Sequence, residues 1–180
     1  MNANQLTLNR QFFECDTVKV ARNLLGKFLI YDGFTGKIIE TEAYLGPEDL
    51  ASHARFKSSK RNHLMFGEAG YIYIYMTYGM HYMFNIVAKE KGKAGAILIR
   101  ALKPPTKAKQ AFDGPGKWTK ALNITKAHNG LDLFNSGFSI EDRNEPPPLI
   151  QITPRIGIDY AGAYKDKPWR FLILPDQGLL

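Results

Sequence analysis

The sequence has few of the residues that build disulfide frameworks and metal sites. It contains one cysteine, Cys15, and four histidines. A single cysteine cannot form an internal disulfide, and the scattered histidines make no convincing zinc constellation, so we expect no metal site. Cys15 follows the aromatic pair Phe12 and Phe13 with no histidine nearby. We therefore interpret it as a small buried thiol and not as a nucleophile.

Long apolar runs are also missing. No stretch approaches the roughly 20 apolar residues of a membrane span, and residues 1–10 lack the apolar core of a secretory signal. The sequence thus predicts a protein that acts away from membranes. We expect it in the cytoplasm, associated with the nucleoid if the source is bacterial.

Size and charge limit the possibilities further. The 180 residues are 44% hydrophobic and 12% aromatic, enough for one buried core but few for two, so we expect one domain over residues 1–180. The 24 Lys and Arg outnumber the 17 Asp and Glu, which gives a net charge of +7. This excess favours a polyanionic partner, either nucleic acid or an anionic membrane surface. Charge alone does not choose between them.

Periodicity predicts a mostly β chain with short helices. Asp16 is a candidate N-cap for a helix that Gly26 ends. We expect a hairpin of strands 27–31 and 37–45, with turn signals at Asp32-Gly33 and Thr35-Gly36, and a helix opening at 114–116. Further strands are expected at 71–76, 81–87, 96–101, 150–151 and 170–174, with a turn at Tyr78-Gly79. The predicted fold class is α+β: one compact domain whose mostly antiparallel curved sheet, or partly open barrel, is flanked by short helices.

The strand 37–45 carries an unusual pair of carboxylates. Strand alternation puts Ile38, Glu40, Glu42 and Tyr44 on one face. Carboxylates on an apolar strand are costly unless they are paired, exposed or functional. A solvated face with lysine partners would explain them, and so would a catalytic role.

Aromatic and basic residues surround this strand in the sequence. His53 lies at the end of the loop after Tyr44, so the two rings could face each other across a slot that accepts a flat base. Tyr78 stands beside Gly79 at an expected turn, from which a ring could wedge into a duplex. Basic residues precede the aromatic cluster, a combination that suits a nucleic-acid surface. They are Arg55, Lys57, Lys60 and Arg61.

These motifs resemble the 3-methyladenine DNA glycosylases of the alkyladenine, or methylpurine, glycosylase family. The similarity covers residues 39–49, 52–53, 61–62, 65–66 and 73–80. It continues through residues 85–86, 98–101, 114–117, 121–122, 155–157 and 167–171, and so spans nearly the whole chain. The chain departs from the usual family pattern at 56–60, where an arginine- and threonine-rich stretch is replaced. That departure concerns DNA affinity and lesion preference more than the chemistry.

The resemblance implies a monofunctional glycosylase that flips alkylated or deaminated purines, such as 3-methyladenine, 7-methylguanine and hypoxanthine, out of double-stranded DNA. Glu42 matches the general base that activates water. Arg100 and the main chain near Leu98 look like partners that hold this water. The family chemistry implies no cofactor and no metal, and we expect a monomer.

The resemblance also assigns the substrate pocket and the DNA contacts. Tyr44, His53 and Tyr75 match the residues that sandwich the flipped base. Asn85 resembles the side chain that tests the purine's exocyclic group, and Tyr78 the residue that fills the gap left in the helix. The remaining DNA-binding candidates are Met80, Arg61 and Lys60.

Two other hypotheses remain open on the residues alone. A carbohydrate glycosidase would pair Glu40 with Glu42, or Glu42 with Glu48, as its two carboxylates. A catalytically silent nucleic-acid-binding module would share the fold without the reaction.

Overall fold

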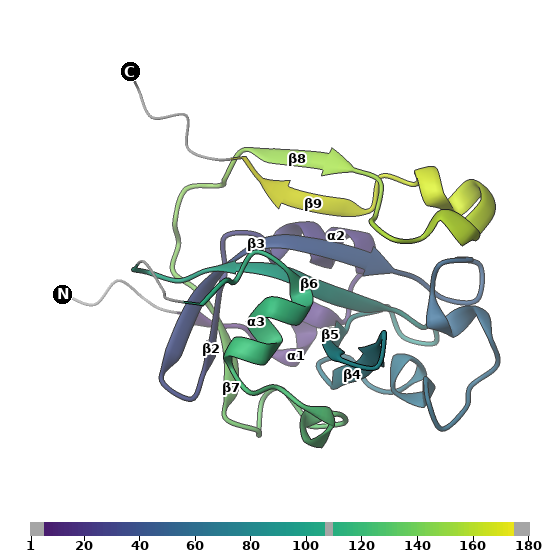
Figure 1. Cartoon of the computed structure of the whole chain (residues 1–180), viewed down its shortest axis with the longest axis horizontal. Coiled ribbons are helices and arrows are strands. Elements are labelled where there is room, and N and C mark those ends of the chain that lie inside the picture. Colours follow the sequence, from purple (N-terminus) through teal and green to yellow (C-terminus); the bar gives the residue numbers. More distant parts are fainter. Residues whose placement is uncertain (1–5, 107–109, 175–180) are drawn as a thin grey trace.

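The strands form one antiparallel sheet (Figure 1). The computed structural model describes residues 6–106 and 110–174. Within them the sheet has nine strands: β1 Leu6–Thr7, β2 Phe28–Tyr31, β3 Phe34–Tyr44, β4 Ile72–Thr77, β5 His81–Val87, β6 Ala96–Lys103, β7 Phe138–Asp142, β8 Ile150–Thr153 and β9 Arg170–Ile173. Their order is β1-β7-β2-β3-β6-β5-β4, while β9 pairs with β3 and β8 with β9. The sheet curls into a half-barrel with few short helices, which confirms the predicted fold class.

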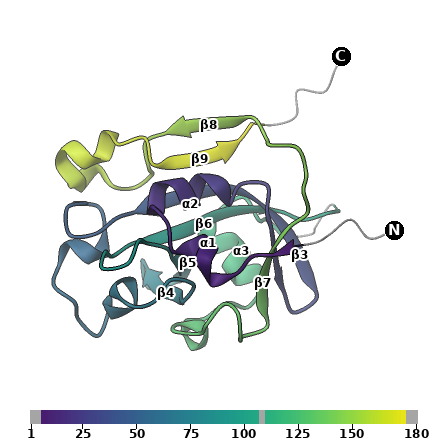
Figure 2. The ribbon, with the colours of Figure 1, turned by 180° about the vertical axis from the view of Figure 1, so that it is seen from behind.

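Short helices lie on both sides of the sheet. Figures 1 and 2 show α1 (Arg10–Phe13) and α2 (Thr17–Asn23) on one side of β3 and β6, and α3 (Pro115–Ala121) on the other. The 3-10 segments are η1 His53–Arg55, η2 His63–Phe66, η3 Lys126–His128 and η4 Asp159–Asp166. In the described part of the chain, no helix has the length and apolar character to cross a membrane.

Helix α2 forms as the sequence predicts. The Asp16 carboxylate caps it by accepting the Lys19 N–H at 2.8 Å. Val20 and Ala21 are buried in the main hydrophobic core. The Thr41 hydroxyl of β3 donates to the Ala21 carbonyl at 2.8 Å, which ties the helix to the central strand. One face of β3 is therefore covered by α2, and the other is left for the site.

The central strand β3 departs from strict alternation. The register with β6 passes from Ile38↔Leu102 to Glu40↔Ala101, so β3 carries one extra residue at this point. Ile38 consequently points into the core, where it is fully buried. The prediction that Ile38 shares a face with Glu40 and Glu42 is wrong, because the bulge reverses the alternation between them.

The hairpin β4–β5 matches its predicted pattern. Ile72 and Ile74 pack in the main core, and Tyr73 belongs to a second cluster on the other face. The chain reverses at Tyr78 and Gly79, whose φ angles are 49° and 68°. Glycine adopts this left-handed conformation freely, but tyrosine does so rarely. The predicted turn is confirmed, and it holds Tyr78 in an uncommon backbone geometry.

Two local expectations are wrong, and two strands were not expected. Cys15 is exposed, because α1 directs Phe13 into the core and the turn that follows points the thiol to solvent. Gly36 lies inside β3 and not in a turn, because the chain already reverses at Asp32 and Gly33. A Cβ at Gly36 would lie 2.7 Å from the Phe34 ring, so this glycine serves close packing. The unexpected strands are β1 and β7.

Candidate active site

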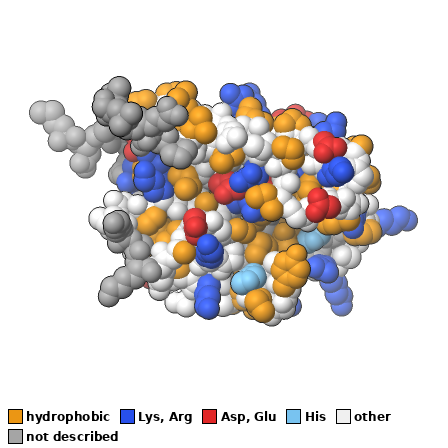
Figure 3. Space-filling view, turned by 45° about the horizontal axis from the view of Figure 1, so that its top comes forward, with side chains coloured by type: hydrophobic (Ala, Val, Ile, Leu, Met, Phe, Trp, Pro, Cys, Tyr) orange, Lys and Arg blue, Asp and Glu red, His pale blue; other side chains and the backbone are white. Residues whose placement is uncertain are grey.

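A cavity of about 590 Å³ opens between the β4–β5 hairpin, β6, the loop after β3 and the segment after β8. Among the residues that line it are seven predicted site residues: Tyr44, His53, Tyr75, Tyr78, Asn85, Leu98 and Arg100. Figure 3 shows a face on which hydrophobic and histidine side chains lie between scattered Lys and Arg side chains. Most of the side chains that line the cavity are aromatic or aliphatic, so it is mainly apolar with a few polar groups, as ligand pockets commonly are.

The sheet register aligns several of these residues. Glu42 of β3 pairs with Leu98 of β6, Leu98 pairs with Asn85 of β5, and Asn85 pairs with Tyr73 of β4. Residues paired across neighbouring strands point to the same face. Four residues that are distant in sequence therefore form one row across the floor of the half-barrel.

Glu42 lies behind the cavity wall with a fully buried side chain. Its Oε2 accepts hydrogen bonds from the Tyr44 hydroxyl at 2.8 Å and from Arg100 Nη1 at 3.2 Å. Its Oε1 accepts the backbone N–H of Ile156 at 2.8 Å. All three partners line the cavity, so the carboxylate is fixed in orientation directly behind its surface.

The second bulge of the central strand pair places Arg100. Between Glu40 and Thr41 of β3, the partner strand passes from Ala101 to Ile99, so Arg100 is the extra residue. A bulge re-aims the side chain that it carries. Arg100 reaches both glutamates, with Nε 2.8 Å from Glu40 Oε1. Glu40 is also bound by Arg170 of β9 at 2.6 Å.

The charges around Glu42 act in opposite directions. Burial raises the pKa of Glu42 above its ordinary value, while Arg100, the Ile156 N–H and the Tyr44 hydroxyl lower it and Glu40 raises it. Burial opposes the charge of Arg100, but Glu42 and Glu40 outweigh this and raise the Arg100 pKa. The arrangement supports a buried carboxylate that can exchange a proton with a group in the cavity.

Aromatic rings form another part of the cavity wall. His53 contacts Tyr75 edge to face, with ring centroids 4.5 Å apart and an interplanar angle of 67°. Its Nδ1 lies 2.8 Å from the Tyr73 hydroxyl. Burial, with Arg61 and Arg55 nearby, lowers the pKa of His53 to about 4, so the imidazole is neutral at pH 7. The rings of Tyr44, His53 and Tyr75 thus offer uncharged surfaces to a ligand.

Asn85 is held at the cavity floor. It is 2% exposed, and its Nδ2 donates to the carbonyls of Tyr73 at 3.1 Å and Met83 at 3.0 Å. These two bonds fix the amide plane, and Asn85 can present its side chain to a ligand in only one orientation.

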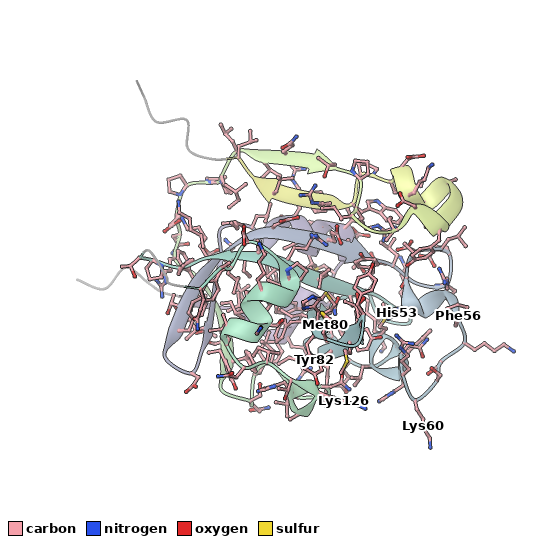
Figure 4. The ribbon with its side chains drawn as sticks, in the orientation of Figure 1. His53, Phe56, Lys60, Met80, Tyr82 and Lys126 are labelled. Carbon is pink, nitrogen blue, oxygen red and sulfur yellow. The ribbon has the colours of Figure 1, made fainter. Side chains whose placement is uncertain are left out.

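The predicted DNA-contact residues lie around the cavity and on its neighbouring loop. Tyr78 and Met80 at the hairpin tip are 88% and 70% exposed, and Tyr78 also lines the cavity. Lys60 and Arg61 are exposed on the loop between η1 and η2. Figure 4 shows Lys60 projecting outward from this loop, whereas Met80 lies on the hairpin. The two groups therefore belong to different elements.

Sequence reasoning missed the segment after β8. Ile156, Gly157, Ile158 and Tyr160 line the cavity, and the main-chain group that reaches the Glu42 carboxylate belongs to Ile156. Leu98, singled out for its main chain, lines the cavity and pairs with Glu42 across the sheet. Only the family resemblance at residues 155–157 could have drawn attention to this segment. In the described residues no cluster of three His, Cys, Asp or Glu side chains could hold a metal ion.

Comparison with known proteins gives one consistent family. The sequence matches the family described as Methylpurine-DNA glycosylase (MPG) over residues 11–177. A protein of Anaeromyxobacter sp. (strain Fw109-5) named "Putative 3-methyladenine DNA glycosylase" is 42% identical over 173 residues, which cover 93% of this chain and 89% of the relative. Proteins of the same name from Legionella pneumophila (strain Corby) and Desulfitobacterium hafniense (strain Y51) are 43% and 37% identical, over 92% and 94% of this chain and 93% and 96% of their own lengths. The chain therefore belongs to the methylpurine-DNA glycosylase family and is a DNA glycosylase, a hydrolase of N-glycosyl bonds.

Proposed function

We propose that the protein is a monofunctional glycosylase that flips alkylated or deaminated purines out of duplex DNA and hydrolyses their glycosidic bond with Glu42 as general base. The observation that carries this proposal is the buried Glu42 carboxylate at the wall of an aromatic cavity, held by Arg100, Tyr44 and the Ile156 N–H. A fixed base beside a pocket for a flat ligand suits attack by water on a nucleotide placed there.

In the proposed step, Glu42 takes a proton from a water molecule while the oxygen of that water attacks the anomeric carbon. The bond from that carbon to the purine nitrogen breaks, and its electron pair leaves with the base. Glu42 must be ionised beforehand, and Arg100 supports that state. Arg100, which lines the cavity, would also help to hold the water.

The cavity walls supply selectivity in this proposal. Tyr44, His53 and Tyr75 stack on the flipped purine, and Asn85 tests its exocyclic group from the floor. Stacking on aromatic side chains contributes about 1–3 kcal/mol per base, which offsets part of the few kcal/mol needed for unstacking. Cationic lesions such as 3-methyladenine and 7-methylguanine leave easily as neutral bases. Hypoxanthine needs protonation or a hydrogen bond on departure.

Duplex DNA would lie across the face that carries the hairpin tip and the basic loop. Tyr78 fills the gap left by the flipped nucleotide, and Met80 contacts the DNA beside this gap. Lys60 and Arg61 contact phosphates. We propose that one copy of the chain is sufficient, since these elements come from a single chain. The place of action is then the chromosome, which in a bacterial cell is the nucleoid in the cytoplasm.

A monofunctional reaction requires that no amine attacks the sugar. Lys117 lines the cavity, but its ammonium is engaged by Asp113 at 3.0 Å. Lys117 in turn lowers the pKa of Asp113 through their hydrogen bond, which keeps that carboxylate ionised. The family resemblance assigns no lysine to Schiff-base formation, so we expect hydrolysis without strand cleavage.

The carbohydrate-glycosidase hypothesis is not supported by this geometry. Arg100 and Arg170 both donate to Glu40 Oε1, so this carboxylate is held in an ion-pair cluster and is not free to act as the second carboxylate of such an enzyme. Glu48 is exposed, whereas Glu42 is buried, so these two do not form a matched pair across one site.

The test is single-turnover release of 3-methyladenine, 7-methylguanine and hypoxanthine from defined duplexes, followed by alkaline cleavage. We expect release by the parent and a loss of about 10²–10⁴-fold in Glu42→Gln, the usual contribution of a general base, with DNA binding retained. The exposed Glu48→Gln is the matched control and should release base like the parent.

The same reactions with borohydride test the monofunctional part. No covalent protein–DNA adduct should be trapped, and strands should stay intact until alkali is added. Absence of release from a folded, DNA-binding parent would contradict the proposal as a whole. A trapped adduct in the parent that is missing in Lys117→Ala would contradict the water nucleophile, but not the glycosylase activity itself.

A further inference from the structure

A fully buried ion pair lies next to the candidate base without touching it. Arg155 donates to Asp49 through Nη1 at 2.6 Å and Nη2 at 2.8 Å, and both side chains are 0% exposed. Two parallel bonds between guanidinium and carboxylate fix distance and orientation together. Replacing a buried ion pair with apolar residues of similar volume often leaves stability unchanged, so stability alone is a weak explanation for this one.

Asp49 connects the pair to the loop after β3. Its Oδ2 accepts the Leu45 N–H and its Oδ1 accepts the Ala51 N–H, both at 3.0 Å. Two residues after Ala51 comes His53, which lines the cavity. The carboxylate therefore anchors the loop that carries one aromatic wall of the pocket.

Arg155 connects the pair to the end of β3 and to the C-terminal hairpin. Nη1 also donates to the Ala43 carbonyl at 2.8 Å. The guanidinium carbon lies 4.7 Å from the ring centroid of Tyr44 and 4.9 Å from that of Trp169. Arg155 thus supports, from behind, the ring whose hydroxyl donates to Glu42.

The residue after Arg155 completes the connection to the base. The Ile156 N–H donates to Glu42 Oε1 at 2.8 Å, and Ile156 lines the cavity. Because Arg155 is held at its side chain by Asp49 and Ala43, the position of the adjacent peptide group depends on the buried pair. Both oxygens of Glu42 are then oriented by groups next to Arg155, one through Tyr44 and one through Ile156.

We propose that the Asp49–Arg155 pair is a positioning device that orients the Glu42 carboxylate and sets the spacing between the pocket walls. This inference rests on the proposed function. Neither residue contacts the reacting atoms in it; the pair acts through Tyr44, Ile156 and the loop to His53. Loss of the pair should slow base release while leaving the DNA-contact elements unchanged.

If the buried pair positions the Ile156 N–H, losing the pair changes the pKa of Glu42, which a pair that only stabilises the fold would not do. Four groups face Glu42. Arg100 from β6, the Ile156 N–H and Tyr44 from β3 lower its pKa, whereas Glu40 from β3 raises it. Tyr75 of β4 and Arg170 of β9 complete this environment. Without the Ile156 hydrogen bond the pKa of Glu42 rises, so the acidic limb of the rate profile moves to higher pH.

The experiment compares the parent with the double variant Asp49→Leu, Arg155→Met, which fills the same space without charge. Single-turnover base release is measured from pH 5 to 9, together with DNA affinity and melting temperature. We expect a loss of about 10²-fold in rate, as for a small misplacement of reacting groups, with an acidic limb at higher pH. DNA affinity should stay within about twofold, because both side chains of the pair are fully buried and cannot contact phosphates.

Two further variants make the result decisive. Asp142→Asn breaks the Lys27–Asp142 pair between β2 and β7, away from the cavity, and should lower the melting temperature without moving the acidic limb. Arg155→Lys keeps the charge beside Asp49 but loses the two parallel hydrogen bonds. If the double variant does not fold, this variant replaces it, and the rate of base release and the position of the acidic limb are compared with those of the parent. A folded variant with the parent's rate and acidic limb overturns the proposal. A parent that releases no base contradicts the proposed function instead.

Discussion

Both glutamates of β3 contact Arg100, and two neighbours of Glu42, Glu40 and Tyr44, have opposite effects on its pKa. Glu40 raises the pKa of Glu42 by like-charge repulsion, whereas the Tyr44 hydroxyl lowers it by a hydrogen bond. In the proposed mechanism Glu42 acts in its ionised form, so the rate should rise with pH through its pKa. We predict that Tyr44→Phe moves this acidic limb to higher pH and that Glu40→Gln moves it to lower pH.

Both variants keep the shape of the site, since the first retains the stacking ring and the second the size of the side chain. A hydrogen bond with a net value of about 1 kcal/mol corresponds to a roughly fivefold lower rate on the acidic limb for Tyr44→Phe, with little change on the plateau. Single-turnover rates against pH measure both shifts. Complete loss of activity in Glu40→Gln would revive the two-carboxylate hypothesis. Shifts in the same direction for both variants would contradict the electrostatic assignment.

Individual site residues could be predicted where a motif carried them, but their mutual contacts could not. Glu42 and Tyr44 share a strand face by simple alternation, and the structure joins them by a hydrogen bond. The Ile156 N–H is a backbone group more than a hundred positions away, and no side-chain pattern marks it. Cys15 shows the reverse error, because a hydrophobic neighbourhood in sequence did not bury its thiol.

Among the elements, the β4–β5 hairpin permits the sharpest test. Its tip holds Tyr78 at φ 49° with 88% of the residue exposed, so the ring has little packing to lose. We predict that Tyr78→Asn leaves the melting temperature unchanged, because asparagine tolerates the left-handed conformation. Base release from duplex DNA should fall about tenfold, since the ring no longer compensates for unstacking.

Two comparisons separate this role from general damage to the site. Tyr78→Phe keeps the ring and should behave like the parent. Release from a single-stranded oligonucleotide, which has no gap to fill, should be equal in Tyr78→Asn and the parent. An equal loss on both substrates would place Tyr78 in base recognition and not in the duplex.

Elements were predictable where local signals agreed with the fold. Asp16 capped α2, and alternating Ile and Tyr residues marked β4, because burial on both faces preserves the pattern. The bulges of β3 and β6 could not be predicted, since they depend on the pairing of two strands about sixty residues apart. These bulges place Arg100 between the glutamates, so the least predictable feature of the sheet is one that builds the site.

On the scale of the whole molecule, the two sides of the sheet have different roles. The face of β3 that carries Thr41 packs against α2, and the opposite face carries Tyr44, which lines the cavity, and Glu42 behind it. Figure 2 shows α1 and α2 covering the rear side. A DNA duplex that reaches the cavity would therefore be remote from α2. Net charge of +7 attracts DNA from a distance, but only basic side chains near the cavity can replace counterions at its phosphates.

This difference predicts how salt dependence responds to position. Lys60→Gln with Arg61→Gln, and the matched control Lys19→Gln with Arg22→Gln on α2, both lower the net charge from +7 to +5. If Lys60 and Arg61 contact phosphates, the first pair should reduce the slope of log affinity against log salt by about 2, because each contact contributes roughly 0.9. The control should leave the slope unchanged and alter affinity only slightly. Titration of duplex binding from 50 to 300 mM salt measures both, and equal slopes for the two variants would mean that DNA is attracted by net charge without contact at this loop.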